Sequence, residues 1–248
     1  MDQCIYHKVS GSKIIFLVLY VDDILLASND LGLLHEVTRF LSQQFDMKDM
    51  SEASYVIGIK IERDRSQQIL GLSQETYINK VFERFHMKDS SLGTVPFFKG
   101  DKFSLDQCPS NDLEKKEMKN IPYASAVKSL MYAQVCTRPD ISYTIGMLGG
   151  YQSNPSLEHW KAAKKVMRYL KRTKDYKLTY KQSDPLDMVG YQDSDFVGCF
   201  ESRKSTSGYV FLLARGIISW GSAKKTLVTI STIEAKFVSC FEAMSQAI

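Results

Sequence analysis

The sequence predicts an α+β fold in which strand patterns at both ends of the chain flank a helical middle. Near the N-terminus, two runs of apolar residues, 14–19 and 24–26, flank a short polar turn, as in a β-hairpin. Between residues 123 and 172, apolar residues recur about every 3.6 positions, which indicates helices. From residue 186 onward, short apolar runs divided by turn residues again favour strands. The 248 residues, 44% of them hydrophobic, are enough for a sizeable core.

The first part of the chain, residues 1–88, alternates strands and helices. After the hairpin, Asn29 or Asp30 can cap a helix. Residues 55–73 then predict two short strands around a polar turn, and Ser73 is placed to cap a second helix. The apolar positions expected to face inward from the two helices are Leu33, Leu34, Val37, Phe40 and Leu41, then Tyr77, Ile78, Val81, Phe82 and Phe85.

The rest of the chain divides into a middle part, 89–185, and a last part, 186–248. Residues 89–122 predict a long irregular connection, because they contain two glycines, three prolines and many charges. Helices are expected at 123–136, 139–152 and 157–172, with prolines near the starts of the second and third, where proline is tolerated. The last part predicts strands over 188–196, 208–214 and 217–220, followed by a helix from Ser231.

Composition excludes several classes of protein. The longest apolar run stops before Asp22, far short of a bilayer span, and the N-terminus lacks the zones of a signal peptide. Five cysteines without a CxxC pair fit free thiols in a reducing compartment. We therefore expect an intracellular protein, cytoplasmic or nuclear, that does not contact membrane. A net charge of +4 favours polyanionic partners only weakly.

The helix predicted at 157–172 concentrates positive charge. Six basic residues recur at spacings that gather them on about one third of the helix surface. They are Lys161, Lys164, Lys165, Arg168, Lys171 and Arg172. The other side carries an apolar stripe of Trp160, Ala163, Val166, Met167 and Leu170. Two interpretations stay open: a solvated basic face over a core stripe, or a surface that contacts the phosphates of a nucleic acid.

Asp22 and Asp23 place two adjacent carboxylates at the tip of the predicted hairpin. Negative charges this close repel each other unless a cation neutralises them, and oxygen ligands suit Mg²⁺ or Mn²⁺. The alternative is an acidic turn surrounded by water. These two residues alone do not decide between a metal site and a solvated turn.

A series of sequence blocks, in the same order along nearly the whole chain, resembles the Pol polyprotein of copia-type LTR retrotransposons. The blocks include "LYVDDILLAS", "IGIKI", "LSQETYINKVFERFHM", "SLMYAQVCTRPDISYTIG", "HWKAAKKVMRYLKRT", "GYQDSDFVG", "RKSTSGYVFLLARGIISW" and "STIEAKF". The resemblance implies a partial reverse transcriptase palm and the start of the thumb in 1–88, a helical thumb and connection in 89–185, and the N-terminal half of a ribonuclease H-like α/β domain in 186–248. The family's activities are RNA-directed DNA polymerisation on an RNA template and cleavage of RNA in an RNA-DNA hybrid.

By this resemblance, Asp22 and Asp23 are two of the carboxylates that hold Mg²⁺, or Mn²⁺, in the polymerase. Two-metal phosphoryl transfer also needs a ligand that bridges the ions, and the family supplies it from an earlier strand. Twenty-one residues precede Asp22, and none of them matches that strand. The fingers and the first half of the palm are therefore expected to be absent, and the polymerase site to be incomplete.

The ribonuclease carboxylates are also expected to be incomplete. Asp193 matches the family's first catalytic and metal-binding carboxylate, whereas Asp195 is expected to be a turn acid. The second falls on Lys236, which places a cation where two dications should gather. Glu234 lies about 200° around the helix from that position and forms a capping-box spacing with Ser231. The third belongs to a later block that we expect beyond the end of the sequence.

The leading hypothesis is therefore a segment of a copia-type Pol polyprotein without catalysis of its own. One alternative is a non-catalytic nucleic-acid-binding module that uses the basic helix. Another is an internal piece of a longer, active Pol. Apolar faces that other parts of Pol would cover should be exposed, so we also expect self-association.

Overall fold

The computed structural model describes residues 4–98, 101, 103–182, 185–195, 204–225 and 228–247. Its contacts divide the chain into two compact units, residues 1–54 and 55–248. Both units combine strands with helices, which confirms the predicted α+β class. The assignment of three parts to palm, thumb and ribonuclease H stays a prediction. No helix in the described ranges has the length and apolar character needed to cross a bilayer.

The first unit is an antiparallel sheet in the order β1-β2-β3 with one helix packed against β2 and β3. Its elements are β1 (Ile5–Ser10), β2 (Lys13–Tyr20), β3 (Asp23–Ser28) and α1 (Leu31–Gln44). Asp30 caps α1, because its carboxylate accepts a hydrogen bond from the Leu33 N–H at 2.8 Å. This bond and the neighbouring Lys13 ammonium lower the pKa of Asp30. Phe40 was expected inward but is 57% exposed.

The second unit contains two antiparallel sheets, ordered β4-β5-β6-β7 and β10-β9-β8. The strands are β4 (Tyr55–Val56), β5 (Ile59–Asp64), β6 (Ile69–Ser73), β7 (Lys177–Lys181), β8 (Val189–Ser194), β9 (Thr206–Leu213) and β10 (Gly216–Lys224). Neither β1 nor β7 is predicted from the sequence. β1 is exposed along its whole length, and β7 is short and alternates only two large apolar residues with polar ones.

Strand β7 joins the two sheets of the second unit. It pairs with β6 along one edge. On its other side, the Tyr180 hydroxyl donates to the carbonyl oxygen of Ile217 at 2.7 Å, and the Lys181 N–H donates to the carbonyl oxygen of Ala214. Gly216 permits this approach, since a Cβ there would lie 2.4 Å from the Tyr180 ring. The C-terminal sheet is therefore attached to the rest of this unit through β7.

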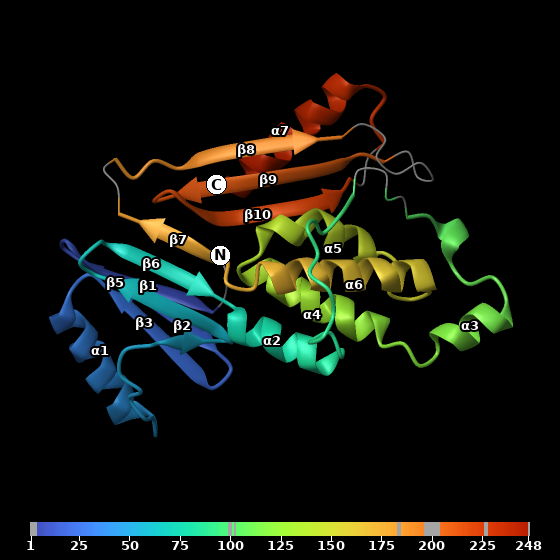
Figure 1. The fold of residues 1–248 in the computed structure, drawn as a ribbon. Helices are drawn as coiled ribbons and strands as arrows, with labels where there is room; N and C mark the ends of the chain where they lie inside the picture. The colour runs from blue at the N-terminus through green and yellow to red at the C-terminus, as the bar shows by residue number, and fades with distance from the viewer. Residues whose placement is uncertain are drawn as a thin grey trace. The chain divides into compact units, whose positions relative to one another are not determined.

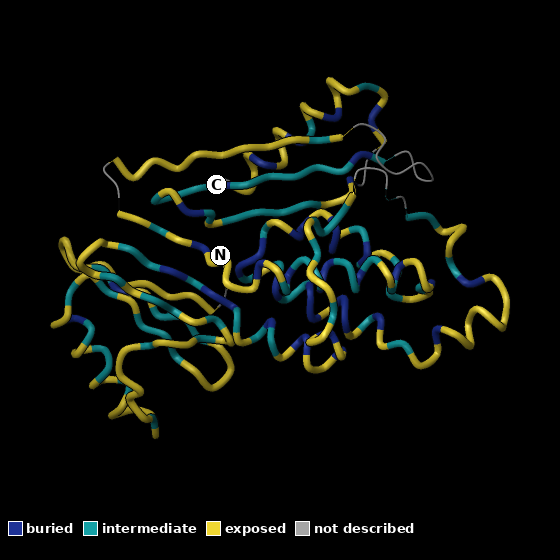
Figure 2. Tube along the Cα trace, in the orientation of Figure 1, coloured by how far each residue is buried: buried dark blue, intermediate teal, exposed yellow. Residues whose placement is uncertain are grey.

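Four helices form the core of the second unit. They are α2 (Glu75–Arg84), α4 (Tyr123–Cys136), α5 (Ser142–Gly149) and α6 (Leu157–Arg172). Figure 1 shows α4, α5 and α6 side by side below β10, and the buried positions in Figure 2 gather in these helices. Leu130, Leu148 and Met167 are fully buried where the helices meet. The predicted bounds of α4 and α6 match the structure to the residue.

Other helices differ from the sequence prediction. The N-cap of α2 is Gln74, while Ser73 ends β6 and its hydroxyl accepts a bond from the Glu75 N–H. The helix expected at 139–152 is a 3-10 turn, η2 (Pro139–Ile141), followed by α5. The connection expected to be irregular contains η1 (Leu105–Gln107) and α3 (Asp112–Met118). Helix α7 (Thr232–Ala247) begins one residue after the predicted start.

A buried histidine lies in the first turn of α6. The His159 ring stacks on Tyr151 with centroids 4.0 Å apart, and its Nε2 has no hydrogen-bond partner among the described residues. Its Nδ1 lies 3.0 Å from the Ser156 N–H, so Nδ1 accepts that bond in a neutral ring. Burial lowers the pKa of His159 from its usual 6.5.

The unfolded chain should therefore take up a proton at His159 at a pH where the folded protein does not. Stability should be constant above about pH 6.5 and fall as the pH drops below it, by at most about 1.4 kcal/mol per pH unit from this residue. Urea unfolding between pH 5 and 8 measures this slope. His159→Phe should flatten it, and the exposed His35→Phe is the control. An unchanged slope in His159→Phe would contradict the assignment.

Candidate metal and nucleic-acid sites

Asp22 and Asp23 lie at the tip of the β2–β3 hairpin, as predicted. Tyr20 and Asp23 form the last pair of the ladder, so Val21 and Asp22 make a two-residue turn. Val21 has a φ of 52°, in the left-handed region that a β-branched residue rarely adopts. Such strain costs on the order of 1–3 kcal/mol and clusters at functional sites. The turn therefore holds both carboxylates outward at a stability cost.

Both carboxylates are exposed, and no cation pairs with either of them among the described residues. Their oxygen atoms are of the type that Mg²⁺ and Mn²⁺ prefer. Across the described ranges, however, no three His, Cys, Asp or Glu side chains gather as metal ligands. The hairpin thus presents two suitable ligands, fewer than a two-metal site requires.

Asp193 lies near the end of β8, where strand alternation fixes the face on which its side chain projects. Asp193 is paired with Gly208, and Ser194 with Ser207. The Ser207 hydroxyl contacts the Glu242 carboxylate of α7 at 3.2 Å, so Ser194 and Ser207 share the face that α7 covers. Side chains alternate between faces along a strand, which places Asp193 on the opposite face. Figure 1 shows α7 passing behind β8 and β9.

The face that carries Asp193 borders a cleft of about 440 Å³ between the C-terminal sheet and the η2–α5 segment. Tyr143, Tyr191 and Trp220 contribute aromatic walls. The Trp220 Nε1–H donates to the carbonyl oxygen of Gln134 at 3.0 Å, which attaches β10 to α4. Burial, with a smaller effect from the Asp195 charge, raises the pKa of Tyr143. Tyr143 and Trp220 could not be predicted from the sequence as part of this site, because their approach to β8 depends on tertiary packing.

Asp195 and Glu234 both have local structural partners. The Asp195 carboxylate accepts a bond from the Thr206 N–H at 2.5 Å and so closes the end of the β8–β9 pair, as expected for a turn acid. The Glu234 carboxylate accepts from the Ile230 N–H at 2.7 Å, while the Ser231 hydroxyl accepts from the Glu234 N–H at 3.1 Å. Glu234 therefore caps α7. Lys236 is exposed two residues further along the helix.

Helix α6 carries its basic residues opposite a buried stripe, but two of them have intramolecular roles. The Lys165 ammonium lies 2.5 Å from the Asp101 carboxylate, and its side chain is only 17% exposed. Lys171 donates to the backbone carbonyls of Lys88 and Ser90. These two lysines fix the connection after α2 against α6, so they are less available to an external ligand.

The other four basic residues of α6 are more available. Lys161 forms an exposed ion pair with Glu158 at 2.6 Å. Within the described part of the chain, Lys164, Arg168 and Arg172 have no carboxylate partner. The Lys164 ammonium instead lies 5.6 Å from the centre of the Trp160 ring. The remaining basic surface of α6 is therefore narrower than the sequence predicts.

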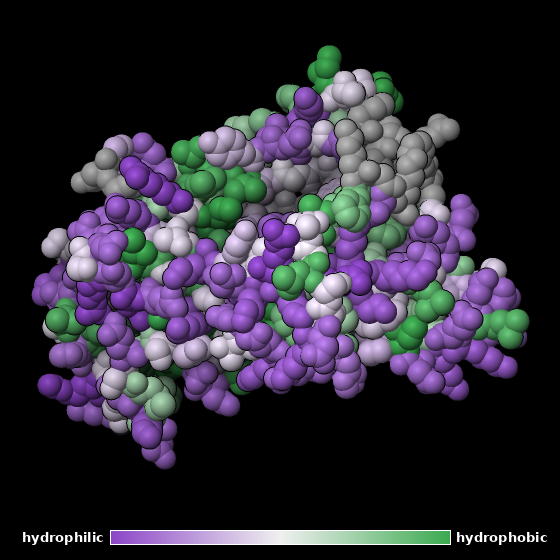
Figure 3. Space-filling view, viewed as in Figure 1, coloured by the Kyte–Doolittle hydropathy of each residue, from purple (hydrophilic) through white to green (hydrophobic). Residues whose placement is uncertain are grey.

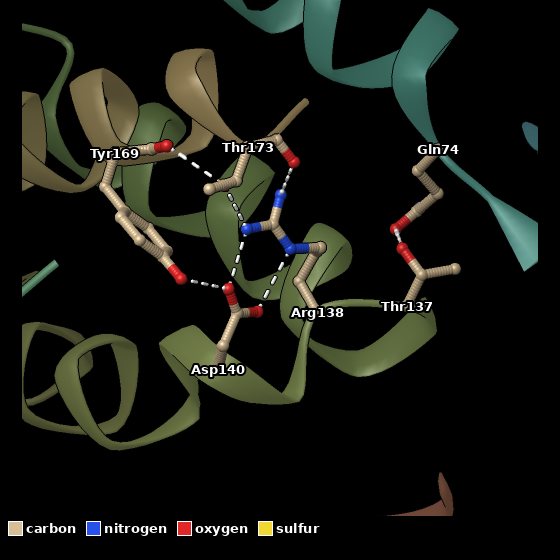
Figure 4. Close-up of polar contacts among 6 residues, drawn as sticks. All are labelled: Gln74, Thr137, Arg138, Asp140, Tyr169 and Thr173. Atoms are coloured by element: carbon tan, nitrogen blue, oxygen red, sulfur yellow. Dashed lines mark hydrogen bonds and ion pairs between the residues drawn. The ribbon is translucent and has the colours of Figure 1, made fainter. Parts of the chain in front are cut away.

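A buried arginine fixes the C-terminal end of α6 (Figure 4). Arg138, 1% exposed, forms a two-point ion pair with Asp140, with Nε–Oδ1 and Nη2–Oδ2 distances of 3.0 and 2.7 Å. Its Nη1 donates to the carbonyl oxygen of Thr173 at 3.0 Å, directly after the helix. The Tyr169 hydroxyl donates to Asp140 at 2.7 Å, and burial together with that carboxylate raises the pKa of Tyr169 to about 12.

A second buried contact lies beside this arginine. The Thr137 hydroxyl donates to the Gln74 side-chain oxygen at 2.8 Å, which connects the start of α2 to the end of α4. Figure 4 shows the two contacts on either side of the chain segment that follows α4. Together they position α6 relative to α2 and α4, and so the basic surface relative to the core.

The chain is similar to reverse transcriptases and to retrotransposon Pol polyproteins. A family model described as reverse transcriptase (RNA-dependent DNA polymerase) matches residues 1–99. The chain is 43% identical over 242 residues to the retrovirus-related Pol polyprotein from transposon TNT 1-94 of Nicotiana tabacum, and 34% identical over 245 residues to that from transposon RE1 of Arabidopsis thaliana. These alignments cover 97% and 99% of the chain but only 18% and 16% of the relatives.

A shorter relative aligns over most of its own length. An uncharacterized mitochondrial protein of Arabidopsis thaliana is 32% identical over 222 residues, which cover 90% of this chain and 88% of that protein. No solved structure matches the chain.

Proposed function

The chain belongs to the family of copia-type LTR retrotransposon Pol polyproteins, and on this basis we propose that it contributes two metal ligands to a polymerase site but does not catalyse on its own. Reverse transcriptases generally use divalent metal ions, which activate the primer hydroxyl and neutralise charge on the phosphates during transfer. Asp22 and Asp23 would bind Mg²⁺ or Mn²⁺ in such a site. Because the described residues offer no third carboxylate beside them, the hairpin alone should bind metal only weakly.

The C-terminal part of the chain would carry an altered ribonuclease H-like site. By the resemblance, Lys236 takes the position where the family has a carboxylate, and it would bring a positive charge to a site that holds dications. Asp193, the remaining matched ligand, projects from the sheet face opposite to the one that α7 covers. These observations support a chain that does not cleave RNA-DNA hybrid by itself.

The single observation that carries the proposal is the exposed pair of carboxylates at the hairpin tip, with Asp22 on the strained two-residue turn and Asp23 directly after it. The purified chain, given a primed RNA template, nucleotides and Mg²⁺ or Mn²⁺, should extend no more primer than Asp22→Asn. Within a longer Pol chain that supplies the bridging ligand, Asp22→Asn should abolish extension. Extension by the isolated chain that depends on Asp22 would contradict the first half. Full activity of Asp22→Asn in the longer chain would exclude a role as a metal ligand.

A second candidate function is binding of nucleic acid through α6. The observation in its favour is that Lys164, Arg168 and Arg172 have no carboxylate partner in the described part of the chain, whereas an ion pair and backbone carbonyls hold Lys165 and Lys171. Such a surface binds phosphates without reading sequence, and its affinity falls with salt concentration. RNA template and RNA-DNA hybrid are the ligands that the family suggests.

A further inference from the structure

Helix α7 buries its small residues and exposes its large apolar ones. Ala235, Ser239 and Ala243 are at most 7% exposed, and the Ser239 hydroxyl donates to the backbone carbonyl of Asp193 in β8. The other side of the helix carries what we call the α7 stripe: Ile233, Phe237, Cys240, Phe241 and Met244. Its four largest members are 64–80% exposed. Figure 3 shows hydrophobic residues that project at the top of the view, where α7 begins.

The spacing of the α7 stripe matches a helical partner. Positions 233, 237, 240 and 244 follow one another at intervals of four, three and four residues, as the a and d positions of a heptad do. At about 100° per residue, these four positions fall within about 60° of one another around the helix. Phe241 lies about 40° further around the helix and flanks this seam, so one helix packed along positions 233, 237, 240 and 244 would also contact it.

We propose that α7 is a homodimer interface in which the stripes of two copies pack antiparallel around a two-fold axis. In that arrangement Phe237 faces Cys240 of the partner subunit, and Ile233 faces Met244 of the partner subunit. The large Phe237 then lies opposite the small Cys240, while Ile233 lies opposite Met244, which has a similar volume, so both layers are filled evenly. A parallel pair would place Phe237 against its own copy and Cys240 against its own copy, one layer overfilled and the next underfilled. The stripe is thus complementary to itself in one orientation.

The area of the α7 stripe is consistent with a second copy. A buried phenylalanine removes about 150–250 Å² from water, so the stripe supplies roughly 600 Å² per copy. The pair would bury about 1,200 Å², the lower limit for specific interfaces. The dimer should therefore dissociate on dilution. It is independent of the polymerase and ribonuclease proposals.

Light scattering after gel filtration tests the interface. The measured mass should rise toward twice that of one chain as concentration increases, and Phe237→Lys should remain at the mass of one chain. Phe237 is 73% exposed, so this change leaves the core intact. Leu113→Lys, at a position 74% exposed on α3, is the matched control and should dimerise like the unmodified chain. An unmodified chain that stays monomeric, or an equal loss of dimer in the control, would overturn the proposal.

Oxidative cross-linking tests the orientation. Ile233→Cys and Met244→Cys are combined in a Cys240→Ser background. Eleven residues of helix separate the two positions by about 16 Å, too far for a bond within one chain. Peptide mapping should find position 233 of one copy bonded to position 244 of the other. Bonds between identical positions would overturn the antiparallel arrangement, and a mixture of linkages in large aggregates would overturn the specific dimer.

Discussion

Replacing Arg138 by alanine is expected to lower the free energy of unfolding of the second unit by about 3–5 kcal/mol. The change would leave Asp140 without its two-point partner and the Thr173 carbonyl without its donor. It would also remove a planar cation whose Cζ lies 5.7 and 5.6 Å from the ring centres of Tyr169 and Tyr176. Removing the arginine costs more than the pair contributes, because the Thr173 carbonyl loses its buried donor and the Asp140 carboxylate, 29% exposed, keeps only the Tyr169 hydroxyl of the contacts described above.

Chemical denaturation monitored by circular dichroism measures this loss. Lys161→Ala, which breaks the exposed pair with Glu158 on the same helix, is the control and should cost less than about 1 kcal/mol. Arg138→Lys should recover only part of the stability, because an ammonium cannot make the two-point contact with Asp140. A loss in Arg138→Ala no greater than in Lys161→Ala would show that the buried network does not hold α6 in place.

The helices of the second unit could be predicted from the sequence because their signals are local. The bounds of α4 and α6 follow from apolar residues at the helical period, and Ser156 caps α6 through the His159 N–H. The β2–β3 hairpin follows from two apolar runs around one turn, and Asp30 caps α1 as its position predicts. In each case the residues that determine the element lie inside it or next to it.

The features that the sequence did not predict depend on distant partners. Strand β7 is defined by its pairing with β6 and its contact with β10, which no local pattern signals. Lys165 and Lys171 share the spacing of the other basic residues on α6. In the structure, however, Lys165 forms an ion pair with Asp101, and Lys171 donates hydrogen bonds to two backbone carbonyls. Likewise, the alternation of β8 predicts that Asp193 and Asp195 share a face, but only the register with β9 and α7 indicates which one.

Replacing the basic residues of α6 that have no intramolecular carboxylate partner among the described residues is expected to have a large effect on nucleic-acid binding. The triple variant Lys164→Glu/Arg168→Glu/Arg172→Glu reverses the three cations that have no carboxylate partner among the described residues. Each phosphate contact contributes about 0.9 to the slope of log affinity against log salt for a duplex. Losing three contacts should therefore reduce that slope by up to about 2.7 and weaken binding to RNA-DNA hybrid more than about tenfold.

Titration of labelled hybrid at several salt concentrations measures both quantities. The matched control is Lys115→Glu/Lys116→Glu/Lys119→Glu, which makes the same change in net charge at exposed positions in and directly after α3. If α6 is the contact surface, only the α6 variant should show a smaller slope of log affinity against log salt. Counterions are released only where the cations contact phosphate. Equal weakening in both variants would instead mean that net charge alone attracts the nucleic acid. An affinity that changes neither with salt concentration nor with the α6 substitutions would rule out phosphate contacts at this helix.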